Sequence, residues 1–525
     1  MMQKIINYIS FLLILFSLGC NTNDSYKEAY RAQYHFSPMK NWMHVPSGLF
    51  YYDGEYHMYY QYNPHGIEWG HMSWGHAISP DLIHWEEQPV AISETDGEMV
   101  FCGSIVVDKD NTSGLGGGFH PPVVAIYTGS RIDNNRQYQC LAYSNDRAKT
   151  WHKYEFNPVL DIGSEHFRDP KVFWYNPDEK WVMVLTNADQ QKLSFYSSKD
   201  LIHWTFMSEF VGEKQKGRLW DNPDFFAIPV NRDSTLKKWI LKVDIGDQSI
   251  KQGMGGLCII GDFDGEEFVP EQINYKGKET VWGIDLALRE KYINVCWNDY
   301  GKDFRGAYSW SDIPDKDGRR IWIGWMNNWN YVNQIPNQKW KGVMSLPREV
   351  YLEKSTNGYE IIQNPVRETS KLRKGKVKIK FSTLDELNNS LTREMENCHS
   401  LEIHVVFDLT KEDRMSLVLF ESVDQQLNLD YSKDKGYIEI LRKVSDPNVL
   451  GDQFTSISDV PIGSQSQLKL DMFIDRTSVE LFINDGKYVA TTRFFPKDYN
   501  IKIENLKSCT SIKEIEVYKM KSIWR

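Results

Sequence analysis

A short motif recurs along the first 350 residues and limits the folds open to this chain. SPDLIHWEE (79–87), SNDRAKTWHKY (144–154) and SSKDLIHWTF (197–206) each place a serine, an aspartate two or three positions later, and a tryptophan before a strand-like run. SWSDIPDKDGRRIWIGW (309–325) is a looser fourth copy. A spacing of roughly 50–70 residues matches four-stranded propeller blades. Residues 35–350 have room for about five such blades, so we predict a five-bladed β-propeller.

Helical periodicity is almost absent before residue 360. Short runs rich in Val, Ile, Tyr, Phe and Trp, such as PVVAIYTG and KWVMVLTN, alternate with Gly, Asn and Asp turns. This pattern is typical of all-β proteins. The aromatic content of 14%, with 18 Trp, fits large β cores, because aromatic side chains favour strands. We assign residues 33–355 to the propeller.

The texture of the chain changes near residue 360. Residues 356–385 are strongly charged and partly helical in pattern, and we interpret them as a linker. Alternating apolar and polar positions then return in runs such as SLEIHVVFDLT and QLKLDMFID. These runs predict that residues 386–525 form a two-sheet β-sandwich.

The N-terminus has the features of an export signal. Lys4 precedes the apolar run 5–18, which is too short to span a bilayer, and Gly19-Cys20 follows it. This resembles a bacterial lipoprotein signal over residues 1–20, in which Cys20 becomes the lipidated first residue. Residues 21–32 would then be a polar tether. The alternative is an ordinary secretory signal with an incidental cysteine. Both interpretations predict export, and the first predicts a lipid anchor in the bacterial envelope.

Charge and cysteine spacing exclude several classes of partner. The chain has 61 basic and 71 acidic side chains, a net charge of −10, and no basic block interleaved with aromatics, so nucleic acid is not expected. No Cys or His spacing indicates zinc, and we predict neither a metal nor a cofactor. We interpret the cysteines after Cys20 as mostly buried thiols: Cys102, Cys140, Cys258, Cys296, Cys398 and Cys509.

Three stretches carry the features of a reaction centre: NWMHVPSG (41–48), FRDPKVFW (167–174) and RLWDNPDFF (218–226). Together with QYNP, FCGS and IDRTSVELFINDG they resemble glycoside hydrolase family 32, the levanases, inulinases and invertases. The resemblance implies a retaining mechanism on β-fructofuranosides such as levan, inulin or sucrose. It assigns an Asp nucleophile to the first motif, an Asp that holds the ring hydroxyls to the second and a Glu acid/base to the third. A retaining site needs two carboxyl groups about 5–5.5 Å apart.

The second and first motifs differ in how well they keep this pattern. Arg168-Asp169-Pro170 is intact, so Asp169 is expected to grip the ring, oriented by Arg168 through charge-assisted hydrogen bonds. In the first motif Val45 stands at the nucleophile position, and valine has no lone pair. His44 replaces the usual Asn. We expect His44 to hydrogen-bond substrate, with a role as substitute base as the alternative.

The third motif reads Trp220-Asp221-Asn222-Pro223-Asp224, where the family has Trp-Glu-Cys-Pro-Asp. Asp221 retains a carboxyl group on a shorter side chain, and a displacement of about 1 Å can cost roughly 100-fold in rate. Loss of a nucleophile costs far more, about a million-fold in a well-studied protease. The family's retaining hydrolysis is therefore expected to be weak or lost.

The resemblance also implies the residues that hold the sugar. The predicted substrate-binding set, in which Cys102 replaces a serine and Trp329 lies at the rim, is Trp42, His44, Gln61, Trp69, Phe101, Cys102, Arg168 and Trp329. Arg305 stands where an aromatic residue is common, which suggests altered specificity. SPDLIHW is interpreted as a turn between blades, and YYDGEYH as a hairpin whose Asp53 stays outside the pocket.

Three hypotheses remain open at this point. The chain is a fructan hydrolase with a weakened site, a fructan-binding pseudoenzyme, or a glycosidase with altered chemistry that uses His44, Asp169 and Asp221.

Overall fold

The computed structural model describes residues 26–95, 97–211, 219–246, 255–271, 295–336, 339–356, 358–445 and 450–524. The predicted signal 1–20, with Cys20, and residues 21–25 lie outside this part of the chain. None of the helices within the described ranges is long and apolar enough to cross a membrane.

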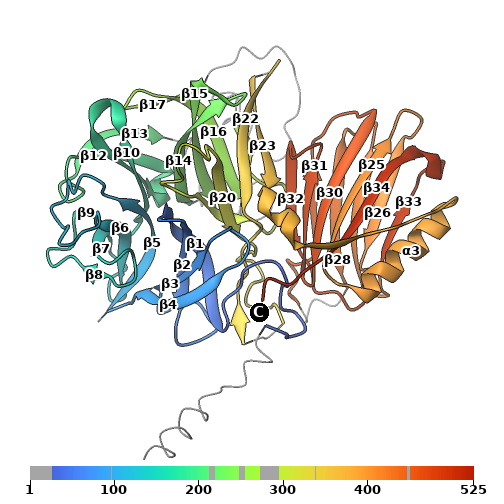
Figure 1. Cartoon of the computed structure of the whole chain (residues 1–525), viewed down its shortest axis with the longest axis horizontal. Helices are drawn as coiled ribbons and strands as arrows, with labels where there is room; N and C mark the ends of the chain where they lie inside the picture. The colour runs from blue at the N-terminus through green and yellow to red at the C-terminus, as the bar shows by residue number, and fades with distance from the viewer. Residues whose placement is uncertain are drawn as a thin grey trace, which may run out of the picture.

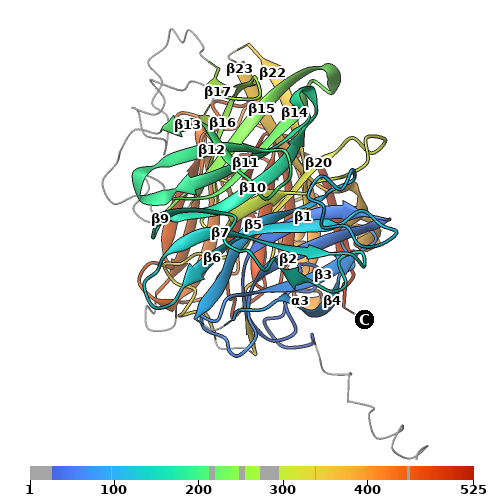
Figure 2. The ribbon, with the colours of Figure 1, turned by 90° about the vertical axis from the view of Figure 1, so that its left-hand side faces the viewer.

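The N-terminal domain consists of five blades arranged around an axis, two of which share one nine-stranded sheet, and this arrangement confirms the predicted propeller (Figures 1 and 2). Blade I contains β1 (Asn41–Tyr52), β2 (Glu55–Asn63), β3 (Ser73–Ser79), β4 (Glu86–Ile92) and the short β21 (Trp340–Lys341). Blade II contains β5 (Glu98–Val107), β6 (Val123–Arg131), β7 (Gln137–Ser144), β8 (His152–Lys153) and β9 (Leu160–Ser164). Blade III contains β10 (Phe167–Tyr175), β11 (Lys180–Asn187), β12 (Lys192–Ser198) and β13 (Thr205–Val211).

Blades IV and V complete the ring. Blade IV contains β14 (Trp220–Val230), β15 (Asp233–Ile245), β16 (Gly255–Phe263), β17 (Phe268–Pro270) and β18 (Val295–Trp297). Blade V contains β19 (Arg305–Ser309), β20 (Arg320–Trp325), β22 (Arg348–Ser355) and β23 (Gly358–Pro365). The two blades join through one parallel register pair, Val230 with Leu352.

The innermost strand of each blade contacts the innermost strand of the next. The order is β1, β5, β10, β14 and β19, and β19 returns to β1. These strands are buried over most of their length; β1, for example, is buried from Trp42 to Phe50. A strand covered on both faces is a continuous buried run, whereas a half-exposed strand alternates. The ring of inner strands is therefore the part of the fold that positions side chains at the axis.

The recurring Ser-x-Asp motif occupies the same place in three blades. It connects the third and fourth strands in blades I, II and III, and Asp81, Asp146 and Asp200 accept hydrogen bonds from backbone N–H groups further along each turn. The prediction that SPDLIHW lies between blades is wrong, because β3 and β4 belong to one sheet. The looser copy at 309–325 spans the connection from β19 to β20, so it is not equivalent to the others.

The C-terminal domain is the predicted β-sandwich (Figure 1). One sheet contains β24 (Arg373–Val377), β34 (Ile512–Met520), β25 (Leu401–Asp408), β30 (Gln467–Asp475), β31 (Ser478–Ile483) and β32 (Tyr488–Arg493). The other contains β29 (Ser456–Val460), β28 (Tyr437–Val444), β27 (Gln425–Ser432), β26 (Arg414–Leu419) and β33 (Ile501–Glu504). Alternation is clear in β27, whose burial repeats every second residue, as expected for strands with one face in a core.

Helical structure is sparse in the described residues. Helix α3 (Leu384–Asn397) begins after Thr383, whose side chain accepts a hydrogen bond from Glu386 N, and it buries Leu387, Leu391 and Met395 at helical spacing. The 3-10 helices are η2 (Asn176–Asp178), η3 (Ala188–Gln190), η4 (Arg367–Leu372) and η5 (Cys509–Ser511).

The segment 356–385, predicted as a linker, contains strands of both domains. β23 pairs with β22 over its whole length, from Gly358 to Pro365, and β24 pairs with β34. β24 is an edge strand with exposed Arg and Lys side chains, a composition that protects sheet edges from further pairing. The high charge of β24 therefore reflects its position at the edge of the sheet.

Residues 26–32, predicted as part of a tether, pack against the folded chain. Arg31 is fully buried, its Nη1 donates to Ser37 Oγ at 2.9 Å, and its guanidinium lies over the Trp340 ring. Tyr26 stacks on Trp524 with ring centroids 4.0 Å apart. The sequence pattern did not indicate the contacts with Trp340 and Trp524, because these two residues are distant in sequence.

The two domains share buried charges. His35, just before blade I, lies between Asp475 and Glu480 of the sandwich, with distances of 2.9 Å from Nδ1 and from Nε2 respectively. Burial lowers the pKa of His35, but hydrogen bonds to Asp475 and Glu480 outweigh this effect and raise it to about 9. Asp475 and Glu480, which lie in the stretch IDRTSVELFINDG, thus hold the sandwich to the propeller.

Candidate functional site

Each inner strand departs from regular pairing near its N-terminal end, and β1 and β14 do so a second time further along. The shifts in register near the N-terminal ends lie between Met43 and Pro46, Val100 and Gly103, Arg168 and Lys171, Asp221 and Asp224, and Arg305 and Tyr308. The predicted site residues on the inner strands of blades I to IV lie in or beside these irregularities, and Arg305 occupies the equivalent place in blade V. Because β-bulges redirect side chains, the repeated irregularity gathers these residues around the propeller axis. Gln61 lies on β2 and Trp69 in the connection that follows it.

Val45 is a packed hydrophobic residue in β1. Its side chain is fully buried, and a Cβ added to Gly306 of β19 would lie 2.1 Å from Val45 Cγ1. The valine therefore sits directly against the glycine backbone. Gly306 has φ +60, a conformation that L side chains rarely adopt. At the position predicted for the nucleophile, the structure therefore places a hydrocarbon side chain against the glycine backbone of the neighbouring blade.

His44 is buried and neutral at ordinary pH. Its Nδ1 donates to Oε1 of Gln61 at 3.1 Å, and its ring meets Trp325 and Trp329 edge-on, with centroids 4.5 and 4.7 Å away. Burial, together with the positive charge of Arg305, lowers the pKa of His44 to about 3. Within the described part of the chain, His44 Nε2 and Trp42 Nε1 are buried without a hydrogen-bond partner. A bound ligand with hydroxyl groups would satisfy both.

Asp221 is held between two arginines. Arg168 donates to Oδ1 from Nε at 2.8 Å and from Nη2 at 2.5 Å, and Arg305 Nη2 donates to Oδ2 at 2.7 Å. Burial alone would raise the pKa of Asp221, but the charges of Arg168 and Arg305 and their hydrogen bonds lower it below its usual value. Both carboxylate oxygens are engaged, and the group is ionised.

This arrangement corrects the predicted role of Arg168. Its Nε lies 3.9 Å from Asp169 Oδ2, beyond hydrogen-bond distance, so Arg168 binds Asp221 in place of orienting Asp169. Arg168 is drawn to Asp221 on β14, because the Asp221 carboxylate lies beside the Arg168 guanidinium. Arg305 binds the other oxygen of the same carboxylate. Sequence comparison had marked Arg305 only as an unusual residue.

Asp169 is oriented by Asn222. Asn222 donates to Asp169 Oδ2 from its backbone N at 3.0 Å and from its side-chain Nδ2 at 3.1 Å, and Asp169 N donates to Thr128 Oγ1 at 2.9 Å. Asp169 and Asn222 have φ +64 and +47, in the left-handed region that Asp and Asn tolerate better than most residues. Burial raises the pKa of Asp169 to about 6; the charge of Arg168 opposes this shift and that of Asp221 adds to it. Asn222 is a positioning residue that sequence reasoning missed.

Cys102 joins the strands at the base of the site. It accepts hydrogen bonds from Gln61 Nε2 at 3.1 Å and Asn222 Nδ2 at 3.5 Å. Burial, with the nearby charge of Asp169, raises the pKa of the Cys102 thiol well above its usual value. The thiol is therefore a neutral packing group, and it links Gln61 of blade I with Asn222 of blade IV.

The predicted aromatic residues occupy two depths. Trp42 is fully buried beneath Trp329, with stacked rings 5.5 Å apart. Trp69 is 45% exposed and meets Phe101 edge-on at 6.1 Å. Phe101 and Trp329 are partly buried. The predicted aromatic residues thus form two groups of contacting rings. Trp42, Trp329 and His44 form one group, and Trp69 and Phe101 form the other.

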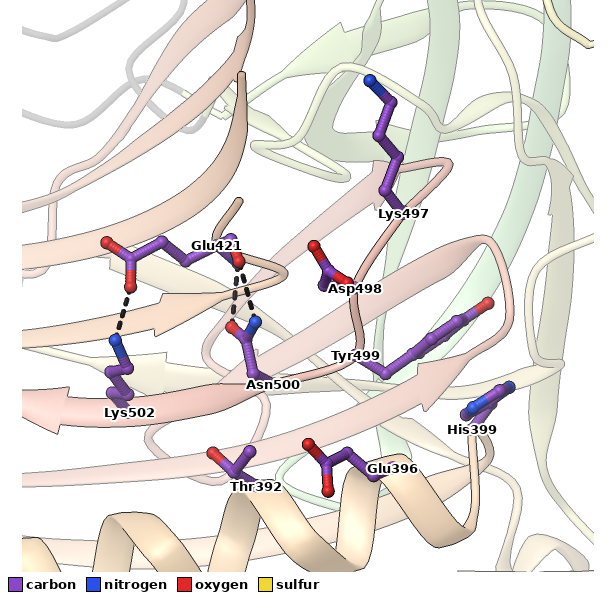
Figure 3. A pocket seen from close by; sticks show the side chains of 9 residues that line it. All are labelled: Thr392, Glu396, His399, Glu421, Lys497, Asp498, Tyr499, Asn500 and Lys502. Carbon is purple, nitrogen blue, oxygen red and sulfur yellow. Dashed lines mark hydrogen bonds and ion pairs between the residues drawn. The ribbon is translucent and has the colours of Figure 1, made fainter. Parts of the chain in front are cut away.

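A separate depression of about 480 Å³ lies on the sandwich beside α3 (Figure 3). Its wall is polar, and Tyr499 stacks on His399 with ring centroids 3.6 Å apart. Its lining residues all come from the sandwich: Thr392, Glu396, His399, Glu421, Lys497, Asp498, Tyr499, Asn500 and Lys502. It shares no residue with the cluster at the propeller axis.

Comparisons with known proteins cover nearly the whole chain. The family model for the N-terminal domain of glycosyl hydrolases family 32 matches residues 35–365, and the model for the C-terminal domain matches residues 368–519. A levanase of Bacillus subtilis is 37% identical over 533 residues, covering 100% of this chain and 75% of the relative. The extracellular exo-inulinase of Aspergillus niger is 33% identical over 534 residues, covering 95% and 96%.

Solved structures agree with this assignment. The exo-inulinase of Aspergillus awamori superposes with a TM-score of 0.81 at 31% identity, covering 95% of this chain and 100% of that one. A β-fructofuranosidase from Schwanniomyces occidentalis, solved with fructosyl-erythritol, gives 0.80 at 27% identity, covering 95% and 99%. With both domain models matched in order and the predicted propeller and sandwich present, the chain belongs to glycoside hydrolase family 32.

Proposed function

We propose that this protein binds β-fructosides at the propeller axis and does not carry out the retaining hydrolysis of its family. The ligand class is the one acted on by its relatives, which include levanases and exo-inulinases. The observation that carries the proposal is the pair of arginines on Asp221. It removes the acid/base function independently of the loss of the nucleophile.

The residue at the predicted nucleophile position, Val45, supports the proposed loss of retaining hydrolysis. A retaining glycosidase forms a bond between a carboxylate and the anomeric carbon, and Val45 offers only methyl groups, packed against Gly306. The hydrocarbon leaves no room for a water molecule at the same spot. Neither a covalent intermediate nor a water activated from this position is available.

The surroundings of Asp221, at the predicted acid/base position, also support the proposed loss of hydrolysis. The group that protonates a leaving oxygen needs a raised pKa so that it carries a proton near neutral pH. Arg168 and Arg305 act in the opposite direction and keep Asp221 ionised. Both of its oxygens already accept charged hydrogen bonds, so Asp221 neither holds nor receives a proton easily.

Several groups that can bind a sugar are present at the propeller axis and its rim. Asp169 is held by Asn222 with a carboxylate oxygen in a buried position, and a charged acceptor binds hydroxyl groups more strongly than a neutral one. His44 Nε2 and Trp42 Nε1 remain unpaired in the described structure. Trp69, with 45% of its surface exposed, offers a ring on which a sugar can stack.

A second candidate is a glycosidase with altered chemistry. It is favoured by Asp169, whose pKa of about 6 suits proton transfer near neutral pH, and by the unprotonated Nε2 of His44. In that case Asp169 protonates the leaving oxygen as the glycosidic bond breaks, water adds to the anomeric carbon and returns a proton to Asp169, and His44 Nε2 accepts a hydrogen bond from that water.

The test combines calorimetric binding with chromatography of products, using sucrose and short levan and inulin oligosaccharides. We expect saturable binding by the wild type and no released fructose, while an exo-inulinase control digests the same samples. Fructose release at a rate near that of the control would overturn the proposal. Slow release that disappears in H44A and persists in D221N would favour altered chemistry.

We further propose that the protein is exported and anchored through lipidated Cys20. The support is the apolar run before Gly19-Cys20 and the similarity to extracellular relatives. Membrane fractionation of cells that express the wild type or C20S tests it: we expect the wild type in the membrane fraction and C20S released into the soluble fraction. Equal partition of both would exclude the anchor.

A further inference from the structure

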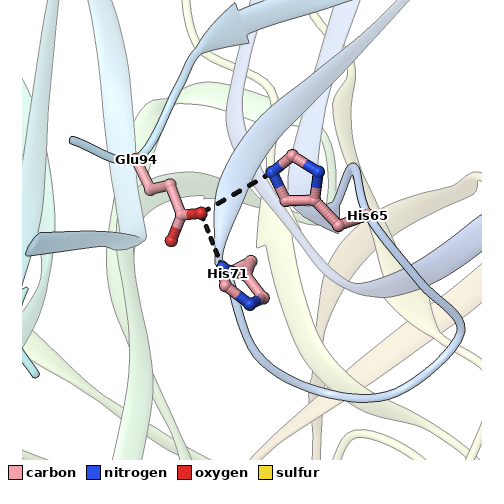
Figure 4. A group of neighbouring side chains, drawn as sticks. All are labelled: His65, His71 and Glu94. Atoms are coloured by element: carbon pink, nitrogen blue, oxygen red, sulfur yellow. Dashed lines mark hydrogen bonds and ion pairs between the residues drawn. The ribbon is translucent and has the colours of Figure 1, made fainter. Parts of the chain in front are cut away.

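Two histidines and a glutamate converge at the rim of blade I (Figure 4). Glu94 Oε1 lies 2.7 Å from His71 Nδ1 and 3.7 Å from His65 Nε2. The three ligand atoms all lie within 4.8 Å of one another. No spacing motif predicts this group, because Glu94 lies 23 residues from His71. We propose that His65, His71 and Glu94 form a binding site for a divalent transition-metal ion such as Zn²⁺.

The ligand set fits Zn²⁺ in number and kind. Two imidazole nitrogens and one carboxylate oxygen, with water as a fourth ligand, are a common zinc environment. Bonds of about 2.0–2.1 Å in a tetrahedron place neighbouring ligand atoms roughly 3.3 Å apart, which lies between the 2.7 and 3.7 Å that separate Glu94 Oε1 from the two histidine nitrogens. The two imidazole rings are nearly perpendicular, at 83° with centroids 5.2 Å apart, so they are not stacked on each other. Ca²⁺ and Mg²⁺ prefer oxygen ligands and fit less well.

The connection that carries the histidines is already held in shape. Asn63, the last residue of β2, accepts a hydrogen bond from His65 N and donates one to Glu68 O, both at 2.8 Å. Glu94 N donates to Ser73 Oγ at 2.9 Å, which fixes Glu94 against the start of β3. His65 and Glu94 are therefore also held by hydrogen bonds to residues outside the cluster, and an ion would not need to organise the connection by itself.

A simple surface ion pair explains only part of this arrangement. His71 and Glu94 alone would form such a pair, which contributes little when exposed. Such a pair does not explain why His65 Nε2 also lies near the same oxygen atom of Glu94, 3.7 Å away. The histidine side chains are 65% and 58% exposed and Glu94 is 20% exposed, so the site is open to ions from solvent.

The site lies next to a residue of the fructoside pocket. Trp69 falls between His65 and His71 in sequence and meets Phe101 at 6.1 Å. A bound ion would restrain the segment that carries Trp69. This consequence rests on the proposed function, whereas metal binding itself does not.

The experiment titrates ZnCl₂ alone into tag-free, chelator-treated full-length protein by calorimetry. We expect one equivalent to bind, at least tenfold more weakly in H65A, H71A and E94Q. The control is H203A, because His203 forms a similar exposed pair with Asp200 at 2.7 Å but has no third ligand in the described structure; H203A is expected to match the wild type. Circular dichroism checks that each variant is folded.

Absence of saturable binding by the wild type would overturn the proposal, as would wild-type affinity in both H65A and H71A. Sucrose binding measured with and without Zn²⁺ then tests the effect on Trp69 separately. Metal binding without a change in sucrose affinity leaves the metal site intact and removes only the link to the pocket.

Discussion

Arg305 on β19 donates a hydrogen bond from Nη2 to Oδ2 of Asp221 on β14, at 2.7 Å, across two neighbouring blades. Arg168 binds the other oxygen from β10. The two guanidinium groups keep the Asp221 carboxylate ionised, and this ion pair is the basis of the proposed loss of a proton donor. The residue at the predicted acid/base position is thus bound by an arginine from a different blade.

The first prediction concerns recovery of hydrolysis. V45D alone should release no detectable fructose, because the acid/base group stays clamped. The triple variant V45D/D221E/R305L restores the carboxylate, lengthens the acid and removes one cation, so we expect turnover at least about 100-fold above V45D. The matched control is V45D/D221E, which keeps Arg305. Fructose release by V45D/D221E equal to that of the triple variant would show that Arg305 does not suppress the acid.

The second prediction concerns Val45 and Gly306. G306A places a methyl group 2.1 Å from Val45 Cγ1 in a backbone conformation with φ +60. Overpacking and left-handed strain together should destabilise the protein by about 2–4 kcal/mol, measured by denaturant unfolding. The control is G54A, where φ is +95 and the added methyl has no neighbour within 4 Å, so that only strain contributes.

The double variant V45A/G306A separates the two contributions. Removing the valine methyls should recover part of the loss, since the contact of 2.1 Å with Cγ1 disappears while the contact of 2.5 Å with Cβ and the backbone strain remain. A loss in the double variant equal to the sum of the single losses would mean that the two residues do not contact each other.

The sequence predicted the fold well because blade repeats and strand alternation are local patterns. It located the inner-strand motifs for the same reason, since each occupies consecutive residues. It did not predict the partner of Asp221, because Arg305 lies 84 residues away and the pairing depends on how blades IV and V meet. The linker prediction failed for a related reason: charged residues in β24 have the composition of a loop but occupy a sheet edge.

The third prediction concerns the pH dependence of fructoside binding. An ionised Asp169 accepts hydrogen bonds from ring hydroxyls better than a protonated one, and its pKa is about 6. Affinity should therefore rise between pH 5 and 7. Asp221, with its lowered pKa, stays ionised and His44, with a pKa of about 3, stays neutral over this range. The slope can thus be assigned to Asp169.

D169N tests this assignment by calorimetry at several pH values. We expect at least tenfold weaker binding at pH 7 and no pH dependence, because the amide does not ionise. D53N is the control, since Asp53 lies in the turn between β1 and β2 and is exposed; it should behave as the wild type. A pH slope that persists in D169N would assign the titration to another group.

The fourth prediction concerns the joint between propeller and sandwich. The pKa of His35 rises from 6.5 to about 9 in the folded protein, so its contribution to stability is complete below about pH 6.5 and is lost as the pH rises through 9. A shift of this size corresponds to at most about 3 kcal/mol. The pKa values of Asp475 and Glu480 are lowered, so their contribution is lost at acidic pH. Thermal unfolding midpoints of the wild type should therefore fall from pH 6.5 to 9.5.

H35Q should unfold at a lower temperature at pH 6.5 and show a flatter slope, because glutamine cannot supply the positive charge. H203Q, which changes an exposed histidine, should keep the wild-type slope. An identical slope in H35Q would mean that His35 is not charged between the two domains.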